Sequence, residues 1–126
     1  MGYKFKSDSI YEFDIDNNGI NEVFKENSCM TDFSTVVYKD SRLLMSGGIK
    51  SNVNQATNQV IDYSFKINER SGKLTIDQRR VLPNMNQRRM NHSSIIIRDH
   101  LFVFFGYIES RQSYSYTVEY LDLVDN

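Results

Sequence analysis

Apolar and polar residues alternate over short runs along most of this sequence, and Asn, Ser, Asp and Gly separate the runs. The apolar positions are mainly Ile, Val, Tyr and Phe, which are favoured in strands, and they do not recur at helical spacing. This pattern predicts an all-β protein. The expected strands are residues 11–15, 20–24, 34–38, 43–47, 60–67, a segment that starts near Lys73, and residues 93–97, 101–105 and 116–123. One more is expected at the N-terminus, where Tyr3 and Phe5 alternate with lysines.

The sequence also contains an internal repeat. "FSTVVYKDSRLLMSGG", residues 33–48, aligns without a gap with "HSSIIIRDHLFVFFGY", residues 92–107. Each stretch reads as an apolar strand, a charged turn, a second apolar strand and a glycine, so that Gly47 matches Gly106. A second set of matches, at similar spacing, starts at Phe13, Phe65 and Leu121. Repeats of about 50 to 60 residues, each with about four short strands, are typical of β-propeller blades.

These repeats resemble the kelch family. Gly47 and Gly48 form the double glycine at the end of a second strand. The segment "LPNMNQRRMNH" carries Met85, Arg89 and His92 at the family's spacing, and "VEYLDL" near the C-terminus has its tyrosine-and-acid pattern. The resemblance implies blades of four-stranded antiparallel sheet.

The chain departs from the kelch pattern at three places. It contains no tryptophan, although one is usual in the fourth strand. Tyr107 replaces the second glycine of the later copy, and Met30 and Phe33 stand at the Arg and His positions of the earlier junction. These departures concern the regularity of the blades more than the class of fold.

The expected architecture is one partial propeller, residues 1–126. Residues 1–32 would end one blade, residues 33–90 would form a complete blade, and residues 91–126 would begin the next. Propellers usually need about four to eight blades, so this chain makes an incomplete ring. Partner subunits, further copies of the chain or the rest of a longer protein are expected to complete it.

The stretch "DIDNNGINEVFK" has the first half of a calcium-binding loop. Asp14, Asp16 and Asn18 stand at the alternating ligand positions, and Gly19 is the sixth residue. The twelfth position, which should be a bidentate glutamate, is Lys25, a cation of the wrong sign. Because Asn-Gly is also a strong hairpin signal, we predict a turn between two strands rather than a metal site. A calcium-binding module remains as an alternative.

Blade topology predicts which loops share a face. In an up-and-down blade, the loop between strands two and three emerges beside the connection from strand four to the next blade. Residues 49–59, 84–91 and 107–115 should therefore lie together, and the turns at residues 39–42 and 98–100 should lie at the opposite end. Loops on a rigid scaffold usually carry binding. The candidate binding-face residues are Asn52, Asn54, Arg88, Arg89, Tyr107, Arg111 and Tyr114.

Two stretches have compositions that bear on partners. Residues 70–89 are locally basic, which suits either an acidic partner or a merely solvated surface. Residues 110–117, "SRQSYSYT", have the tyrosine and serine content of recognition surfaces, or form the start of a strand.

Overall charge and cysteine content give further expectations. Fifteen basic and 16 acidic residues leave a net charge of −1, which provides no general attraction to nucleic acid or anionic membranes. The single cysteine, Cys29, cannot form an internal disulfide, so the chain fits a reducing compartment such as the cytoplasm. No apolar run is long enough to insert into a membrane.

No catalytic or cofactor-binding signature is found. His92 and His100 have no carboxylate or thiolate at metal-ligand spacing, and His92 is expected to hydrogen-bond to backbone. Phosphate loops, nucleophile elbows and paired carboxylates are not recognisable. We therefore expect a protein that is not an enzyme and has no cofactor.

The kelch resemblance implies a non-catalytic protein-interaction module, a scaffold or a subunit of a larger assembly. Cytoskeletal scaffolds and the substrate-recognition parts of ubiquitin ligases both use such domains. Copper oxidases are also built on kelch-type propellers, but they require a cluster of histidine and tyrosine ligands, which two distant histidines do not suggest.

Overall fold

The computed structural model describes residues 9–26 and 29–126 of the chain. These residues form 14 strands in five antiparallel sheets, with one short 3-10 helix, η1 (Glu109–Arg111), and no α-helix. The predicted all-β class is therefore confirmed. Within these ranges, no sheet closes into a ring, and no helix is long and apolar enough to span a lipid bilayer.

The largest sheet is a four-stranded antiparallel meander. It consists of β4 (Ser34–Tyr38), β5 (Arg42–Ser46), β8 (Val60–Ile67) and β9 (Leu74–Leu82), each paired with the next in the chain. Together with its loops, residues 33–90, it is called the central unit below. The nine strands expected from the alternation of apolar residues all exist, and their bounds lie within two residues of the prediction.

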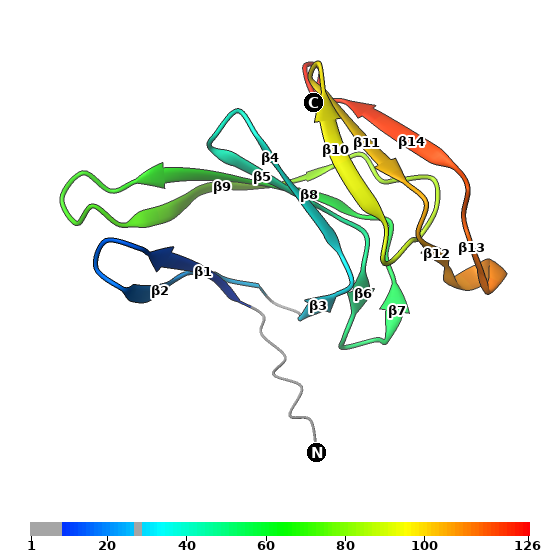
Figure 1. The fold of residues 1–126 in the computed structure, drawn as a ribbon, viewed down its shortest axis with the longest axis horizontal. Helices are drawn as coiled ribbons and strands as arrows, with labels where there is room; N and C mark the ends of the chain where they lie inside the picture. Colours follow the sequence, from blue (N-terminus) through cyan, green and yellow to red (C-terminus); the bar gives the residue numbers. More distant parts are fainter. Residues whose placement is uncertain (1–8, 27–28) are drawn as a thin grey trace.

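A three-stranded sheet follows at the C-terminus. It contains β10 (Ser93–Ile97), β11 (His100–Phe104) and β14 (Val118–Asp122). Residues 91–126 are called the C-terminal unit. The first strands of the two units, β4 and β10, lie side by side (Figure 1), joined by the Ser34 and Ser94 hydroxyls at 2.6 Å.

The N-terminal hairpin consists of β1 (Ser9–Asp14) and β2 (Gly19–Lys25). It lies beside the β8–β9 end of the central sheet, on the side away from the C-terminal unit (Figure 1). The further strand predicted around Tyr3 and Phe5 lies outside the described residues.

Five very short strands were not predicted. They are β3 (Met30–Thr31), β6 (Ile49–Lys50) and β7 (Gln55–Ala56) in one small sheet, and β12 (Tyr107–Ile108) and β13 (Ser113–Tyr114) in another. Each is too short for an alternating pattern to be recognisable. The β6–β7 and β12–β13 hairpins extend the long loops between the second and third strands of each unit.

The repeat predicted from the sequence is present in the backbone hydrogen bonds. Three N–H···O=C bonds of the central unit recur, with the same spacing between donor and acceptor, in the C-terminal unit. They join Gly47 to Gln59, Thr57 to Gly48 and Phe65 to Ser41, and then Phe105 to Thr117, Ser115 to Gly106 and Leu123 to Asp99. The two units therefore have the same local fold from the turn before the second strand to the third strand.

This pattern corrects the gapless alignment. The turn between β4 and β5 contains residues 39–41, whereas the turn between β10 and β11 contains only Arg98 and Asp99, so the later copy is shortened by one position within the turn. Phe105, and not Gly106, consequently lies at the position of Gly47, and both have positive φ. The match of Leu121 with Phe65 was also wrong, since Leu123 makes the equivalent hydrogen bond.

The N-terminal hairpin repeats the β8–β9 hairpin. Each has one β-bulge, at Ile10–Tyr11 and at Ser64–Phe65. Each loop also begins with a side-chain oxygen, from Asp14 or Asn68, that accepts two backbone N–H groups. Asp14 therefore corresponds to Asn68, and the sequence match of Phe13 with Phe65 was wrong by two positions. The hairpin thus corresponds to the third and fourth strands of a preceding unit.

Apolar layers cover both faces of the central sheet. The layer against the C-terminal unit contains Tyr38, Leu44, Val60, Leu82, Met85, Leu101, Val103 and Leu123. The layer against the N-terminal hairpin contains Met45, Ile61 and Tyr63, with Ile10, Phe24, Met30, Leu43, Phe65 and Ile76 packed on them. The central sheet is therefore enclosed between two neighbouring elements of the same repeat.

Candidate functional site

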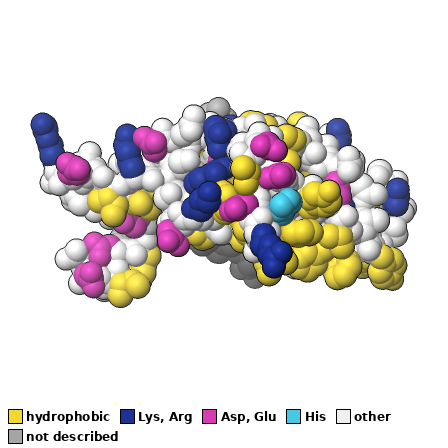
Figure 2. Space-filling view, turned by 90° about the horizontal axis from the view of Figure 1, so that it is seen from above, with side chains coloured by type: hydrophobic (Ala, Val, Ile, Leu, Met, Phe, Trp, Pro, Cys, Tyr) yellow, Lys and Arg dark blue, Asp and Glu magenta, His cyan; other side chains and the backbone are white. Residues whose placement is uncertain are grey.

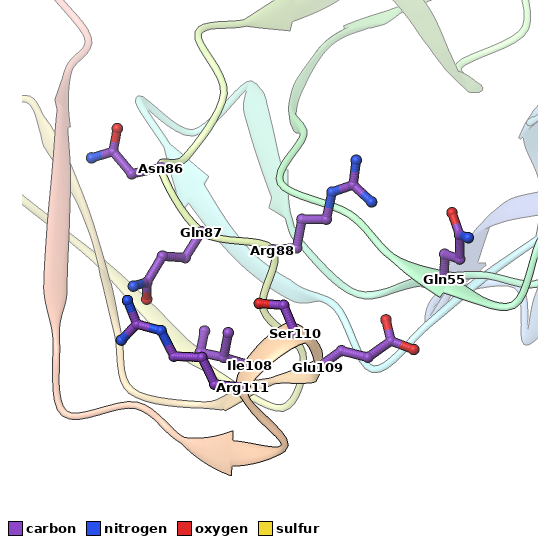
Figure 3. Close-up of a pocket in the computed structure, with 8 residues that line it drawn as sticks. All are labelled: Gln55, Asn86, Gln87, Arg88, Ile108, Glu109, Ser110 and Arg111. Atoms are coloured by element: carbon purple, nitrogen blue, oxygen red, sulfur yellow. The ribbon is translucent and has the colours of Figure 1, made fainter.

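A cleft of about 550 Å³ lies on the loop face. It lies between the β6–β7 hairpin, the segment that connects β9 to β10, and η1 of the C-terminal unit (Figure 3). It is lined by Gln55, Asn86, Gln87, Arg88, Ile108, Glu109, Ser110 and Arg111. All these residues belong to the three segments that the blade topology predicted to share a face, and the structure brings those segments together.

Local backbone geometry holds these segments in place. Positive φ at Gly47 and Gly48, and at Phe105 and Gly106, turns the chain out of the second strand and into each loop hairpin. The Glu109 carboxylate then accepts a hydrogen bond from the backbone N–H of Ala56 at 3.0 Å, which ties η1 to the hairpin of the central unit. The cleft is thus bridged by a contact between the two units.

Two arginines carry the free positive charge of the cleft. Arg111 and Gln87 point toward one another on one side, while Arg88 points toward Gln55 on the other (Figure 3). Among the described residues, no hydrogen-bond or ion-pair partner is found for either guanidinium. Glu109 is the only carboxylate among the described residues that line the cleft, and it accepts a hydrogen bond from the backbone N–H of Ala56. This neutral donor leaves the charge of Glu109 unchanged, so two guanidinium groups and one carboxylate give the cleft lining a net positive charge.

A smaller hollow of about 250 Å³ adjoins the cleft. Gln55 and Arg88 line both, and the smaller hollow adds Lys50. A ligand that crosses the loop face would meet Arg111, Arg88 and Lys50 in turn. Guanidinium and ammonium groups favour carboxylates and phosphates as partners.

The predicted binding-face residues have different surroundings. Arg88 and Arg111 line the cleft. Asn52 and Asn54 are exposed in the turn of the β6–β7 hairpin, where Asn54 has φ 51°. That these residues bind a partner stays a prediction.

Tyr107 and Tyr114 face each other across the β12–β13 pair, with ring centroids 5.5 Å apart. Tyr107 is half-buried and Tyr114 is 72% exposed. The sequence stretch around Tyr114 therefore supplies an exposed aromatic ring beside η1, and its role in binding stays a prediction.

Arg89, also predicted for the binding face, is fully buried, and that prediction is wrong. One of its terminal nitrogens donates to the backbone oxygen of Phe105 at 2.8 Å, and the other donates to the Glu119 carboxylate. Further bonds reach the backbone and hydroxyl oxygens of Thr117. Sequence composition showed that this segment was basic but not which of its arginines turned inward.

His92 is also buried, and its partner differs from the expected one. Its Nε2 lies 2.8 Å from the hydroxyl of Ser46, so the hydrogen bond is to a side chain and not to backbone. Burial lowers the pKa of His92 to about 4, and the positive charge of Arg89 adds to the effect. His92 is therefore neutral near pH 7 and structural in its contacts.

The hairpin predicted at residues 14–19 is confirmed. Asp14 pairs with Gly19, and Asn18 has φ 49° in the loop between them. Hydrogen bonds from the Asn17 side chain and from the N–H groups of Asn17 and Asp16 lower the pKa of Asp14. Both Asp14 carboxylate oxygens thus serve the turn, and the described residues contain no group of three or more His, Cys, Asp or Glu placed to hold a metal ion.

Several cleft residues were not singled out from the sequence. Glu109, Gln87 and Gln55 have no distinguishing motif, and only their place in the long loops marked them. The sequence matches no protein-family model and no curated protein. The loop-face geometry and the repeat therefore carry the functional interpretation.

Proposed function

We propose that this chain is a non-catalytic protein-interaction module made of kelch-type β-propeller blades. Three observations support the fold assignment: the double glycine and the Met, Arg and His spacing in the sequence, the four-stranded meander, and the recurrence of the same hydrogen bonds in the C-terminal unit. Blades stack face to face around a common axis, and the adjacent first strands β4 and β10 are consistent with that arrangement.

The chain would form part of a larger assembly. Apart from the two small sheets of two-residue strands, its described sheets are a hairpin, one four-stranded sheet and one three-stranded sheet, fewer than the roughly four to eight blades of a ring. A scaffold and the substrate-recognition part of a ubiquitin ligase are both forms of such an interaction module.

The binding site proposed for this module is the loop-face cleft. The observation that carries this proposal is that loops from two successive units meet around a hollow of about 550 Å³ with two guanidinium groups, Arg88 and Arg111, that have no partner among the described residues. A polypeptide segment with Asp or Glu side chains supplies the complementary charge, and the side-chain amides of Gln55, Asn86 and Gln87 line the cleft as a type of group that hydrogen-bonds peptide backbone. The ligand class is thus an acidic peptide segment of a protein partner.

Peptide selection followed by calorimetry tests this proposal. Peptides enriched on the wild-type chain from a random display library should contain carboxylates, and their Kd should rise about tenfold in each of the variants Arg88→Glu and Arg111→Glu, a loss of about 1.4 kcal/mol. The matched control is Arg98→Glu, which makes the same charge change in the β10–β11 turn, outside the cleft.

The control should bind with wild-type affinity. An unselective pool without carboxylates, or peptides whose affinity is lowered equally by all three substitutions, would contradict the proposal, because the effect would then be one of overall charge. Thermal melts of the variants confirm that each is folded before its affinity is compared.

A further inference from the structure

The outer face of the C-terminal sheet is mostly apolar, and none of the described strands packs on it. Residues of alternate positions on its three strands form this face, and Figure 2 shows hydrophobic side chains gathered in this part of the molecule. Its apolar residues, called the C-terminal apolar face, are Ile95, Ile97, Phe102, Phe104, Val118 and Tyr120, and the polar Ser93, His100 and Asp122 share the same side of the sheet. Exposed fractions reach 51% for Ile97, 55% for Val118 and 69% for Tyr120, which is unusual for so many neighbouring apolar side chains.

The internal repeat shows what covers the equivalent face of the central unit. The shared strand registers and hydrogen bonds give each apolar position a counterpart in the central unit. Ile95, Ile97, Phe102 and Val118 correspond to Val36, Tyr38, Leu44 and Val60. All four counterparts lie in the layer that the C-terminal sheet covers. The partner that fits the C-terminal apolar face is therefore another sheet of the same repeat.

The N-terminal hairpin has an exposed apolar face of its own, on the side where a preceding unit would lie. Tyr11, Phe13 and Ile20 lie on one side of it and are 55%, 60% and 69% exposed. The matching β-bulges of the two hairpins place Tyr11 at the position of Phe65. Phe65 packs in the layer on the N-terminal side of the central sheet, where the preceding hairpin covers it. The hairpin thus exposes a face that is normally covered by the unit before it.

We propose that the C-terminal apolar face binds the N-terminal hairpin of a second copy of this chain, so that copies associate head to tail. One face requires a following unit and the other requires a preceding unit, and both belong to the same molecule. Such contacts join different surfaces of the two copies, and they generate a ring or an open chain of subunits. This interaction rests on the larger assembly of the proposed function and names its subunit, and it uses neither the cleft nor the loop face.

Light scattering after gel filtration of the whole chain, over a range of concentrations, is the first test. The wild-type mass should rise above the 14.8 kDa of one chain as concentration increases. Two paired substitutions, Phe13→Lys with Ile20→Lys and Val118→Lys with Tyr120→Lys, should each give a monomer at every concentration. All four side chains are at least 55% exposed, so folding should be retained, and a thermal melt checks it.

The control is Val53→Lys, a half-exposed valine in the β6–β7 turn that belongs to neither face. It should associate as the wild type does. If either lysine pair lowers the melting temperature, the corresponding serine pair replaces it.

A mixture of the two paired variants gives the sharpest result. Each retains the face that the other has lost, so an equimolar mixture should form one dimer of about twice the chain mass and nothing larger. Three outcomes would overturn the proposal: a monomeric wild type at all concentrations, a mixture that stays monomeric, or continued association of the hairpin variant alone. The last would show that like faces pair, and the first that the occupant is another polypeptide.

Discussion

The central and C-terminal units share a backbone but use different side chains to hold it. The junction that leads into β4 of the central unit has the apolar residues Met30 and Phe33 at the positions where the kelch pattern has Arg and His. Before the C-terminal unit, the equivalent positions are Arg89 and His92. Met30 packs in an apolar layer, whereas Arg89 is a buried cation held by hydrogen bonds and by Glu119. The same backbone conformation at the junction is therefore compatible either with apolar packing or with a buried ion pair.

The same contrast recurs within the sheets. Asp62 in β8 is fully buried and receives hydrogen bonds from Arg42 and Arg80. Burial opposes its ionisation, but these two arginines outweigh that effect and keep the pKa of Asp62 below its ordinary value. Its counterpart in β14 is Tyr120, which is exposed and has its ring centroid 5.8 Å from that of Phe102. Positions with a constrained backbone conformation therefore recur in both units. The side chains between these positions differ according to the element that covers each sheet.

The largest effect is expected where the backbone has no room. A methyl group at Gly47, which has φ 61°, would lie 2.4 Å from the backbone oxygen of Arg89 and 2.5 Å from the His92 ring. We expect Gly47→Ala to destabilise the chain by about 4 kcal/mol, from strained φ and from steric overlap with backbone. Urea unfolding followed by circular dichroism measures the free energy change.

Gly72→Ala is the matched control for that substitution. Gly72 also has positive φ, 67°, but a methyl group there would meet nothing within 4 Å. Its substitution should cost only about 1 kcal/mol, the backbone component alone. Equal losses of unfolding free energy for the two variants would show that steric overlap at Gly47 does not contribute to the destabilisation.

The next largest effect concerns the ionic junction. Arg89→Met introduces the residue found at the equivalent position of the earlier junction. The substitution removes the donors to the Phe105 and Thr117 oxygens and leaves the Glu119 carboxylate, which is 13% exposed, without its cation. We expect a loss of about 3 kcal/mol in unfolding free energy, because an uncompensated charge remains in a poorly solvated site.

Arg88→Met, one residue earlier and on the cleft surface, is the control for Arg89→Met. It should change stability by no more than about 0.5 kcal/mol, as surface substitutions do. If Arg89→Met were as stable as Arg88→Met, the apolar and ionic junctions would be interchangeable, and the contrast between the units would have no energetic basis.

The pKa of His92 predicts a smaller, pH-dependent effect. Burial lowers this pKa to about 4 in the folded chain, while the unfolded histidine has its ordinary value of 6.5. Below pH 6.5 the unfolded chain binds a proton that the folded chain does not, so stability is complete above pH 6.5 and falls as the pH decreases toward 4. Between pH 7 and pH 5 the loss should be about 2 kcal/mol, measured by urea unfolding at each pH.

His92→Gln keeps a hydrogen-bonding side chain beside Ser46 but does not titrate. The variant should lose most of the stability change between pH 7 and pH 5, although its stability at pH 7 is lower. A pH dependence identical to that of the wild type would show that another group is responsible.

The long strands and their approximate bounds were predictable from sequence because each is long enough to show alternation. The shortest strands were not, and neither was the shortening of the β10–β11 turn by one position. A gapless match of glycines placed Gly106 opposite Gly47, since glycine is the usual signal of positive φ. That signal failed because Phe105 adopts φ 64° without being glycine.

The candidate site was predicted in outline only. Up-and-down topology was sufficient to place three loops on one face, because the connections of a meander alternate between its two ends. Side-chain direction was not predictable: adjacent Arg88 and Arg89 have the same chemistry, yet one lines the cleft and the other is buried. Pairing across the units, as between Glu109 and Ala56, depends on tertiary contacts that a local pattern does not contain.

The smallest expected effect tests whether Phe105 is strained at the position where the central unit has Gly47. Its φ of 64° is unfavourable for a bulky side chain, by about 1 kcal/mol, and its ring is 51% exposed against Phe104. Phe105→Gly should relieve the strain and lose only the ring contact, for a net stabilisation of about 0.5 kcal/mol. Phe105→Ala loses the same contact but keeps the strained Cβ, so it should be less stable than the glycine variant by about 1 kcal/mol. If the alanine variant were the more stable of the two, the backbone at residue 105 would not be strained. The two units would then differ at this site only in side-chain chemistry.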